Sequence, residues 1–173
     1  MMGYLDVRLI NLIDPYVSYK TVWDLGCGKD APHTSLFINL FSSKIVAVDK
    51  DLDLPNKDQI TMMKSLFKDI DPPDQIDVAF LSWPINHATP GLVNILEKAE
   101  VIIYVGNNVD GNQCGNKELF HHLIGREVLE CCPDRTNTLM VYGRNQRTGL
   151  DLYGEEKAFF STERIMTFSE AHS

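Results

Sequence analysis

The sequence predicts an α/β fold with a mostly parallel sheet, and three observations support this expectation. Short apolar runs alternate five times with stretches of helical periodicity, which is the pattern of strands connected by crossover helices. Two of these runs, residues 76–81 and 101–105, are apolar apart from Asp77, as strands covered by helices on both faces are. The last two predicted strands have no helix between them, so they are expected to pair antiparallel.

The first predicted element is an amphipathic helix over residues 4–13. Leu5, Leu9 and Ile13 recur at helical intervals, and Pro15 is expected to end the helix. A strand, a helix and a second strand then complete the first crossover unit. Their predicted ranges are 20–25, 31–41 and 44–49.

Two polar or proline-rich segments separate the elements that follow. Residues 51–58 are predicted to form a loop, and the adjacent prolines 72 and 73 break the chain before the fourth strand. Strands are predicted at 60–65, 76–81, 101–105, 138–142 and 157–160, and helices at 90–98 and 117–131. A polar loop over 143–154 joins the last two strands, and the tail is expected to fray after residue 165.

Length and charge restrict the class of protein. The 173 residues are enough for one domain, and residues 1–173 are predicted to form it. A content of 44% hydrophobic and 23% charged residues is ordinary for a globular chain. The formal net charge of −8 offers no general attraction for duplex nucleic acid, which is therefore not predicted as a partner. Residues 144–147, with Lys117 and Arg126, form a candidate basic patch, and scattered surface cations are the alternative interpretation.

The cysteines and the first residues exclude further classes. The four cysteines, at positions 27, 114, 131 and 132, include no Cys-x-x-Cys pair and no histidine at a zinc-like interval. Neither a metal site nor a disulfide framework is predicted, and Cys131 and Cys132 are expected at a helix end. Residues 1–8 contain an early acid and no long apolar run, so neither a signal peptide nor a membrane span is expected. A cytoplasmic location is therefore predicted.

A ligand site is indicated where the first strand ends. Asp24 precedes the turn Gly26-Cys27-Gly28, and two glycines allow a ligand to approach bare backbone. The second strand ends at Asp49, and an acid at that place in a βαβ unit can accept hydrogen bonds from the two hydroxyls of a ribose. The predicted ligand is a nucleoside derivative.

The glycine spacing is compatible with two kinds of nucleoside ligand. Gly26-x-Gly28-x-x-Ala31 also satisfies the looser dinucleotide pattern, so an NAD-dependent oxidoreductase remains an alternative. Asp24 would lie beside the diphosphate of such a ligand and repel it. Pro32 places the helix start near residue 30 or 31, too late for the helix N-terminus to face phosphates. An acid before the glycines suits a ligand with a cationic amino group.

With Asp24, Gly26 and Gly28 matching the motif acid-x-Gly-x-Gly, the sequence resembles the class I S-adenosylmethionine-dependent methyltransferases. The resemblance covers nearly the whole chain. It implies a three-layer Rossmann-like methyltransferase fold with a mostly parallel seven-stranded sheet, an antiparallel C-terminal hairpin and the cofactor over the carboxyl ends of the first strands. It also implies that Asp24 holds the methionine part of the cofactor and that Asp49 holds the ribose.

The resemblance further implies a set of cofactor-binding residues. Near the third strand the family often carries an acid close to the adenine amine, and here that acid is missing or displaced to Asp69. The backbone of Leu66 is expected to contact the base, and Phe67 either packs on the base or belongs to the core. The full predicted set is Asp24, Gly26, Cys27, Gly28, Asp49, Lys50, Leu66, Phe67 and Ser82.

The segment Ser82-Trp83-Pro84 follows the fourth strand, where the family often carries Asp/Asn/Ser-Pro-Pro-aromatic. Here the aromatic residue comes second and there is one proline, so an amino-group acceptor is not specifically predicted. Trp83 stacks on an acceptor, lies near the sulfonium as a cation–π partner, or belongs to the core. His87 is a candidate general base, with an ordinary loop histidine as the alternative. These four residues form the predicted catalytic set.

The resulting functional hypothesis is methyl transfer from S-adenosylmethionine to an unidentified acceptor, either a small molecule or a macromolecule. Displacement at a sulfonium needs alignment and in some cases a base, so no nucleophilic triad is required. A non-catalytic S-adenosylmethionine-binding module is the first alternative, because the segment around Trp83 departs from the family motif. The NAD-dependent oxidoreductase is the second alternative.

Overall fold

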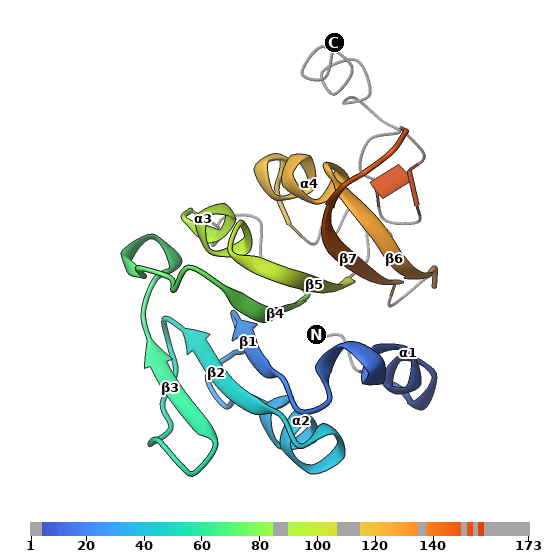
Figure 1. Cartoon of the computed structure of the whole chain (residues 1–173). Helices are drawn as coiled ribbons and strands as arrows, with labels where there is room; N and C mark the ends of the chain where they lie inside the picture. The colour runs from blue at the N-terminus through green and yellow to red at the C-terminus, as the bar shows by residue number, and fades with distance from the viewer. Residues whose placement is uncertain are drawn as a thin grey trace.

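A seven-stranded sheet organises the chain, and its strand order is β3-β2-β1-β4-β5-β7-β6 (Figure 1). The computed structural model describes residues 5–84, 90–106, 115–134, 138–149, 152–153 and 156–157. The strands are β1 (Thr21–Leu25), β2 (Lys44–Asp49), β3 (Ile60–Lys64), β4 (Ile76–Ser82), β5 (Ala99–Gly106), β6 (Arg126–Cys132) and β7 (Thr138–Gln146). β1 to β5 are parallel, and β7 runs antiparallel to both β5 and β6. The predicted fold class is confirmed.

Helices cover both faces of the sheet and form the outer two layers (Figure 1). The helices α1 (Val7–Val17) and α2 (Thr34–Phe41) bury their apolar side chains against one face. The helices α3 (Leu92–Leu96) and α4 (Lys117–Ile124) bury theirs against the other face. A short 3₁₀ helix, η1 (Phe67–Asp69), precedes β4. No helix among the described residues has both the length and the apolar character needed to cross a membrane.

The central strands are buried on both faces, as their continuous apolar runs predicted. In β4, Val78 and Phe80 pack with α1 and α2, whereas Ala79 and Leu81 pack with α3 and α4. This alternation follows from the period of two in an extended strand. The carboxyl ends of β1, β2 and β4 consequently meet at one edge of the sheet between the two helix layers.

The first helix passes through the proline that was expected to end it. α1 continues to Val17, and Ile13 and Val17 are both fully buried. Pro15 lacks an N–H and removes one helix hydrogen bond, but it lies in the last turn, where the packing of Val17 keeps the chain helical. Asp6 caps the helix start by accepting a hydrogen bond from the Leu9 amide at 3.0 Å.

The prediction for the end of the chain was wrong in its details. The helix expected over 117–131 ends at Ile124, and β6 follows Gly125, so Cys131 and Cys132 lie in a strand. The antiparallel hairpin consists of β6 and β7, and β7 includes residues assigned to the predicted loop. Residue 157 lies in a helical turn, and residues 158–160 fall outside the described part of the chain. Apolar residues four apart in 120–128 imitate a helix, although Gly125 breaks it.

The candidate basic patch is not assembled at the surface. Arg126 is buried and donates to the carbonyl oxygens of Leu96, Ala99 and Gly143. The Arg147 side chain is 7% exposed. Two of the four cations that defined the patch therefore serve the packing of the hairpin.

Candidate functional site

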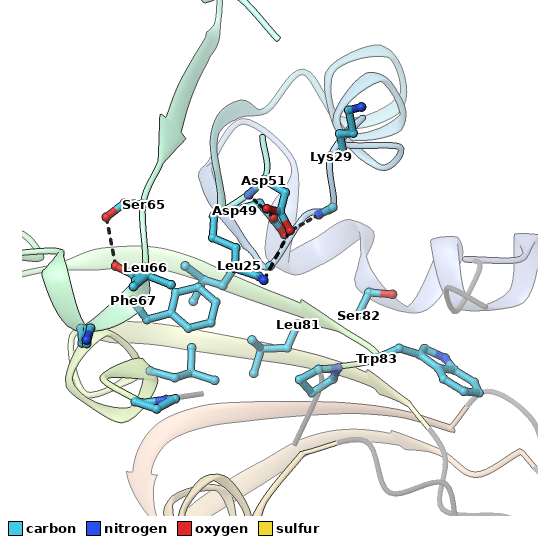
Figure 2. Close-up of a pocket in the computed structure, with 17 residues that line it drawn as sticks. Leu25, Lys29, Asp49, Asp51, Ser65, Leu66, Phe67, Leu81, Ser82 and Trp83 are labelled. Carbon is cyan, nitrogen blue, oxygen red and sulfur yellow. Dashed lines mark hydrogen bonds and ion pairs between the residues drawn. The ribbon is translucent and has the colours of Figure 1, made fainter. Parts of the chain in front are cut away.

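A cavity of about 630 Å³ opens at the carboxyl ends of β1, β2 and β4. Five segments line it: the glycine turn after β1, the end of β2, the segment from Ser65 to Lys68, the end of β4, and the start of α3 (Figure 2). The lining residues are Leu25, Gly26, Gly28, Lys29, Asp49, Lys50, Asp51, Ser65, Leu66, Phe67, Lys68, Leu81, Ser82, Trp83, Pro84, Pro90 and Leu92. Such a volume lies in the usual range for small-molecule and cofactor sites.

The turn after β1 depends on its two glycines. Gly26 has φ of +73° and Gly28 has φ of +84°, a region that residues with a Cβ rarely adopt. The amides of Gly26 and Cys27 both donate to the carbonyl oxygen of Val48, at 2.8 and 3.1 Å. These bonds tie the turn to β2 and leave its backbone exposed to the cavity.

Asp49 is held in a fixed orientation at the end of β2. Its Oδ2 accepts a hydrogen bond from the Gly28 amide at 2.9 Å, and its Oδ1 accepts one from the Asp51 amide at 2.8 Å (Figure 2). A carboxylate oxygen can accept more than one hydrogen bond, so both oxygens keep capacity for hydroxyl donors. The predicted ribose-binding residue therefore lines the cavity beside the glycine turn.

Asp24 is buried and incompletely satisfied. It follows Val22 by two residues and shares the sheet face covered by α1 and α2. The carboxylate is 1% exposed, and its Oδ2 has no hydrogen-bond partner among the described residues. Burial, with a further contribution from the Asp49 charge, raises the pKa of Asp24 from 3.8 to about 7. Asp24 does not line the cavity, although its neighbours Leu25 and Gly26 do.

Cys27 directs its side chain away from the cavity. The thiol is buried in the hydrophobic cluster on the α1 and α2 side, and its Sγ donates to the Gly28 carbonyl at 3.4 Å. Burial raises the pKa of the Cys27 thiol, and the charges of Asp24 and Asp49 raise it further. The side chain of this predicted cofactor-binding residue is thus a neutral core group, and only its backbone belongs to the turn.

The segment after β3 forms another wall of the cavity. Leu66 and Phe67, two of the predicted cofactor-binding residues, line the cavity together with Ser65 and Lys68. Asp69 is exposed and is not a lining residue, so the displaced acid considered from the sequence does not reach the cavity. Ser65 lines the cavity in this wall, and its hydroxyl donates to the Leu66 carbonyl at 3.0 Å.

Ser82, Trp83 and Pro84 line the cavity at the end of β4. Trp83 adopts φ of +50°, which is unfavourable for a residue with a large side chain. Its amide donates to the Val105 carbonyl at 2.7 Å and fixes this geometry. Strained backbone of this kind often marks a functional site. In the view of Figure 2, Leu81 is drawn between Phe67 and Trp83.

The remaining site residues include one predicted residue at the cavity, one outside the described chain and four that the sequence did not predict. Lys50 lines the cavity and forms an exposed ion pair with Asp51 at 3.5 Å. His87 lies outside the described residues. The sequence missed Lys29, Asp51, Ser65 and Lys68, whose only signal is that each adjoins or closely follows a predicted site residue. The described residues include no group of three His, Cys, Asp or Glu side chains able to hold a metal ion.

The start of α2 bears on the dinucleotide alternative. The helix was predicted from residue 31, but it begins at Thr34, with His33 before it and Pro32 in the preceding turn. Residues 29–33 therefore separate Gly28 from the helix. In a dinucleotide site the helix N-terminus follows the glycines directly and binds the diphosphate.

Comparison with solved structures gives matches over most of the chain. A 1,6-didemethyltoxoflavin-N1-methyltransferase from Burkholderia thailandensis, bound to 1,6-didemethyltoxoflavin and S-adenosylhomocysteine, is 14% identical, with a TM-score of 0.58 over 80% of this chain and 76% of that chain. Sp1610 of Streptococcus pneumoniae, a proposed tRNA methyltransferase in complex with S-adenosylmethionine, is 14% identical, with a TM-score of 0.57 over 98% and 83%. TrmK of M. capricolum, in complex with S-adenosylhomocysteine, is 12% identical, with a TM-score of 0.53 over 98% and 84%.

Sequence comparison finds no corresponding relatives. No protein-family model matches the chain, and no curated protein matches it. The structural likeness therefore bears on the fold. This chain has a seven-stranded sheet with an antiparallel β7 between β5 and β6, and the matches extend over 80–98% of the chain. The chain has the fold of the class I S-adenosylmethionine-dependent methyltransferases.

Proposed function

We propose that the chain binds S-adenosylmethionine in the cavity and transfers its methyl group to an acceptor. The observation that carries this proposal is the Asp49 carboxylate, which Gly28 and Asp51 hold at the cavity wall with acceptor capacity to spare. A ribose offers two adjacent hydroxyl donors that suit such a group. Further support comes from proteins of the same fold that were crystallised with this cofactor or its product.

The residues along the cavity suit the parts of this cofactor in order. Leu66 and Phe67 would flank the adenine, and Asp49 would accept hydrogen bonds from the ribose. Asp24 lies behind the wall formed by Leu25 and Gly26 and would act on the methionine end from there, because its buried and unpartnered oxygen favours a nearby cationic amino group. Ser82, Trp83 and Pro84 would shape the end where the acceptor enters.

The chain contributes alignment rather than covalent chemistry. The bound cofactor supplies an electrophilic methyl group on a sulfonium. Asp49 and the glycine turn would orient the nucleoside, and the hydrogen bond from the Trp83 amide to Val105 would help to position the acceptor end. A general base would accept a proton where the acceptor carries one, and His87 remains the candidate from the sequence.

The structure supports the oxidoreductase less than it supports the non-catalytic module. The separation of α2 from the glycine turn differs from the arrangement that binds a dinucleotide diphosphate, so the described residues give the oxidoreductase less support. The non-catalytic module keeps one specific observation, since Trp83 packs against both hydrophobic clusters and can be read as a core residue. Turnover is what distinguishes that module from an enzyme.

Transfer of a labelled methyl group tests the function. The protein is incubated with S-adenosylmethionine labelled at its methyl group and with small-molecule, RNA and protein fractions of a cell extract. We expect label in one fraction with the unmodified chain and much less with Asp49→Asn. Binding of the cofactor without labelling of any fraction would contradict the catalytic half of the proposal and favour the non-catalytic module.

Replacement of Asp49 by asparagine is expected to weaken binding of S-adenosylhomocysteine. The amide keeps the size of the side chain but loses an acceptor and the charge. A hydrogen bond to a charged group contributes about 1.5–3 kcal/mol, so affinity should fall roughly tenfold to a hundredfold. Isothermal titration calorimetry measures this change.

Asp53→Asn is the matched control, because Asp53 is an exposed acid of the same region that does not line the cavity. It removes the same charge and should leave the affinity unchanged. Equal affinities of the Asp49 and Asp53 variants would show that Asp49 does not bind the ribose.

A further inference from the structure

Phe67 lies between Gly26, in the glycine turn after β1, and Gly91, before α3. It begins η1 and lines the cavity. On one side, a Cβ placed on Gly26 would lie 3.7 Å from the tip of its ring, at Cζ, which is ordinary van der Waals contact. The ring therefore fills the space next to the glycine turn without crowding it. On the other side, the Phe67 and Lys68 backbone meets Gly91.

The contact at Gly91 is much closer than the contact at Gly26. A Cβ on Gly91 would lie 2.4 Å from Lys68 Cα, 2.5 Å from Lys68 N and 2.9 Å from the Phe67 carbonyl carbon. All three are backbone atoms, so no side-chain rotation can relieve the overlap. Gly91 also has φ of +86°, as the residue that precedes α3. The absence of a side chain at this position lets α3 and η1 meet at backbone distance.

The backbone that would have to move is part of the cavity wall. The Asp69 and Ile70 amides donate to the carbonyl oxygens of Leu66 and Phe67, each at 3.1 Å. These bonds make the segment a compact unit, and Ile70 packs against the core. A displacement at Lys68 would therefore be transmitted to Leu66 and Phe67, which line the cavity together with it.

We propose that Gly91 is a positioning residue, whose missing side chain sets the separation between η1 and the glycine turn and so the width of the nucleoside end of the cavity. Gly91 itself does not line the cavity and acts through Phe67 and Lys68. The inference rests on the proposed function for its ligand, but the placement of η1 can be measured without a ligand.

Gly91→Ala tests the proposal, and Gly149→Ala is its matched control. Gly149 has φ of +89° and no neighbouring atom within 4 Å of an added Cβ, so the two variants share the backbone strain and differ in the overlap. The added Cβ overlaps the Lys68 backbone and displaces the cavity wall, so we expect roughly tenfold weaker binding of S-adenosylhomocysteine by Gly91→Ala. The Gly149 variant should bind as the unmodified protein does.

Hydrogen exchange separates positioning from a general loss of stability. In the ligand-free proteins, amides of residues 66–70 should exchange faster in Gly91→Ala than in Gly149→Ala, at a temperature where circular dichroism shows both folded. Unchanged exchange at these amides overturns the proposal. Faster exchange with unchanged affinity also overturns it, because η1 would then move without affecting the site.

Failure of ligand binding and failure of Gly91→Ala to fold can each be told apart from failure of the Gly91 proposal. If the unmodified protein does not bind S-adenosylhomocysteine, the proposed function fails while the exchange comparison still reports on η1. If Gly91→Ala does not fold, the unmodified protein is measured with saturating S-adenosylhomocysteine. Slower exchange at residues 94–96 of α3, which do not line the cavity, together with 66–70 is then the expected result, and protection confined to the lining segments contradicts the coupling.

Discussion

Replacing Asp24 by asparagine is expected to stabilise the ligand-free protein above pH 7 and to weaken its binding of S-adenosylmethionine. The carboxylate is buried with an unpartnered Oδ2, and burial with the nearby Asp49 charge raises its pKa to about 7. Ionisation of Asp24 in the folded protein therefore costs free energy. The amide is isosteric and carries no charge, so it removes that cost and also removes the attraction for a cationic amino group.

The sign of the pH dependence follows from the pKa values of the two states. The folded-state pKa of Asp24 is higher than the ordinary value of 3.8, so the folded protein binds the proton more tightly than the unfolded chain does. The contribution of Asp24 to stability thus falls between pH 4 and pH 7 and stays constant above. At 1.36 kcal/mol per pKa unit, the full effect is about 4 kcal/mol as an upper figure.

Urea unfolding at pH 4.5 and pH 8 measures this prediction. The free energy of unfolding of Asp24→Asn, relative to the unmodified protein, should be more favourable at pH 8 than at pH 4.5. Asp53→Asn controls for the change in net charge. An equal difference at both pH values would mean that Asp24 ionises normally. A gain in stability with unchanged cofactor affinity would remove Asp24 from the methionine site.

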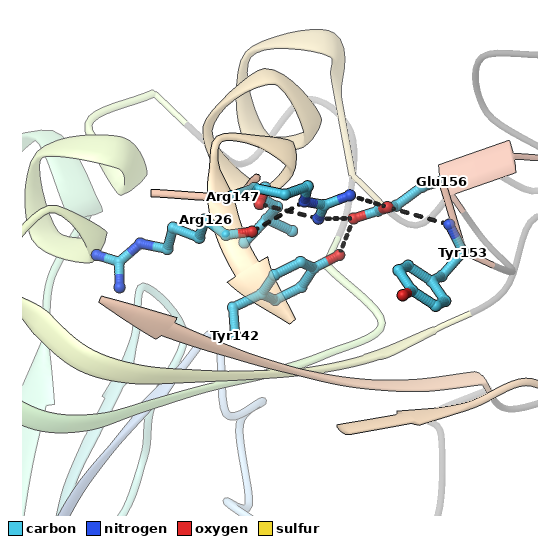
Figure 3. Close-up of polar contacts among 6 residues, drawn as sticks. Arg126, Tyr142, Arg147, Tyr153 and Glu156 are labelled. Carbon is cyan, nitrogen blue, oxygen red and sulfur yellow. Dashed lines mark hydrogen bonds and ion pairs between the residues drawn. The ribbon is translucent and has the colours of Figure 1, made fainter. Parts of the chain in front are cut away.

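Replacing Glu156 by alanine is expected to destabilise the protein without touching the cavity. Glu156 is fully buried, and both of its oxygens accept hydrogen bonds from the Arg147 guanidinium, at 2.7 and 2.9 Å (Figure 3). The Tyr142 hydroxyl donates to the same carboxylate, and the Tyr153 amide donates to it at 3.2 Å. Removing one partner of a buried pair leaves an uncompensated charge and costs about 3–5 kcal/mol.

Urea unfolding at pH 7 checks the loss, with Lys157→Ala as an exposed neighbouring control. Arg147→Ala should be destabilising as well, and the double variant should lose much less than the two single losses combined. Affinity for S-adenosylhomocysteine should be unchanged under folding conditions, because none of these residues lines the cavity. Additive losses would show that the pair does not act as a unit.

The sequence predicted the central sheet well because its signals are local. Apolar runs in β4 and β5 reflect burial on both faces, and the acids near the ends of β1 and β2 mark the edge where the cavity opens. A family motif and the positions of the strand ends are enough to predict four of the residues that line the cavity: Asp49, Leu66, Phe67 and Ser82.

The remaining features depend on contacts that the sequence does not encode locally. Trp83 follows β4 with a positive φ, and its amide donates to the Val105 carbonyl in β5. The burial of the Cys27 side chain depends on the fold of the glycine turn. Gly91 gives no signal by itself, because the backbone that it approaches is more than twenty residues away in the chain. β6 was mistaken for helix because its apolar spacing continues that of α4.

Calorimetric titration of the unmodified protein with S-adenosylhomocysteine and, in parallel, with NAD tests the proposed cofactor site. The cavity at the ends of β1 and β2 should bind the adenosyl ligand at a single site per chain and should show no binding of NAD at the same concentrations. Binding of NAD with no binding of S-adenosylhomocysteine would contradict the proposed cofactor.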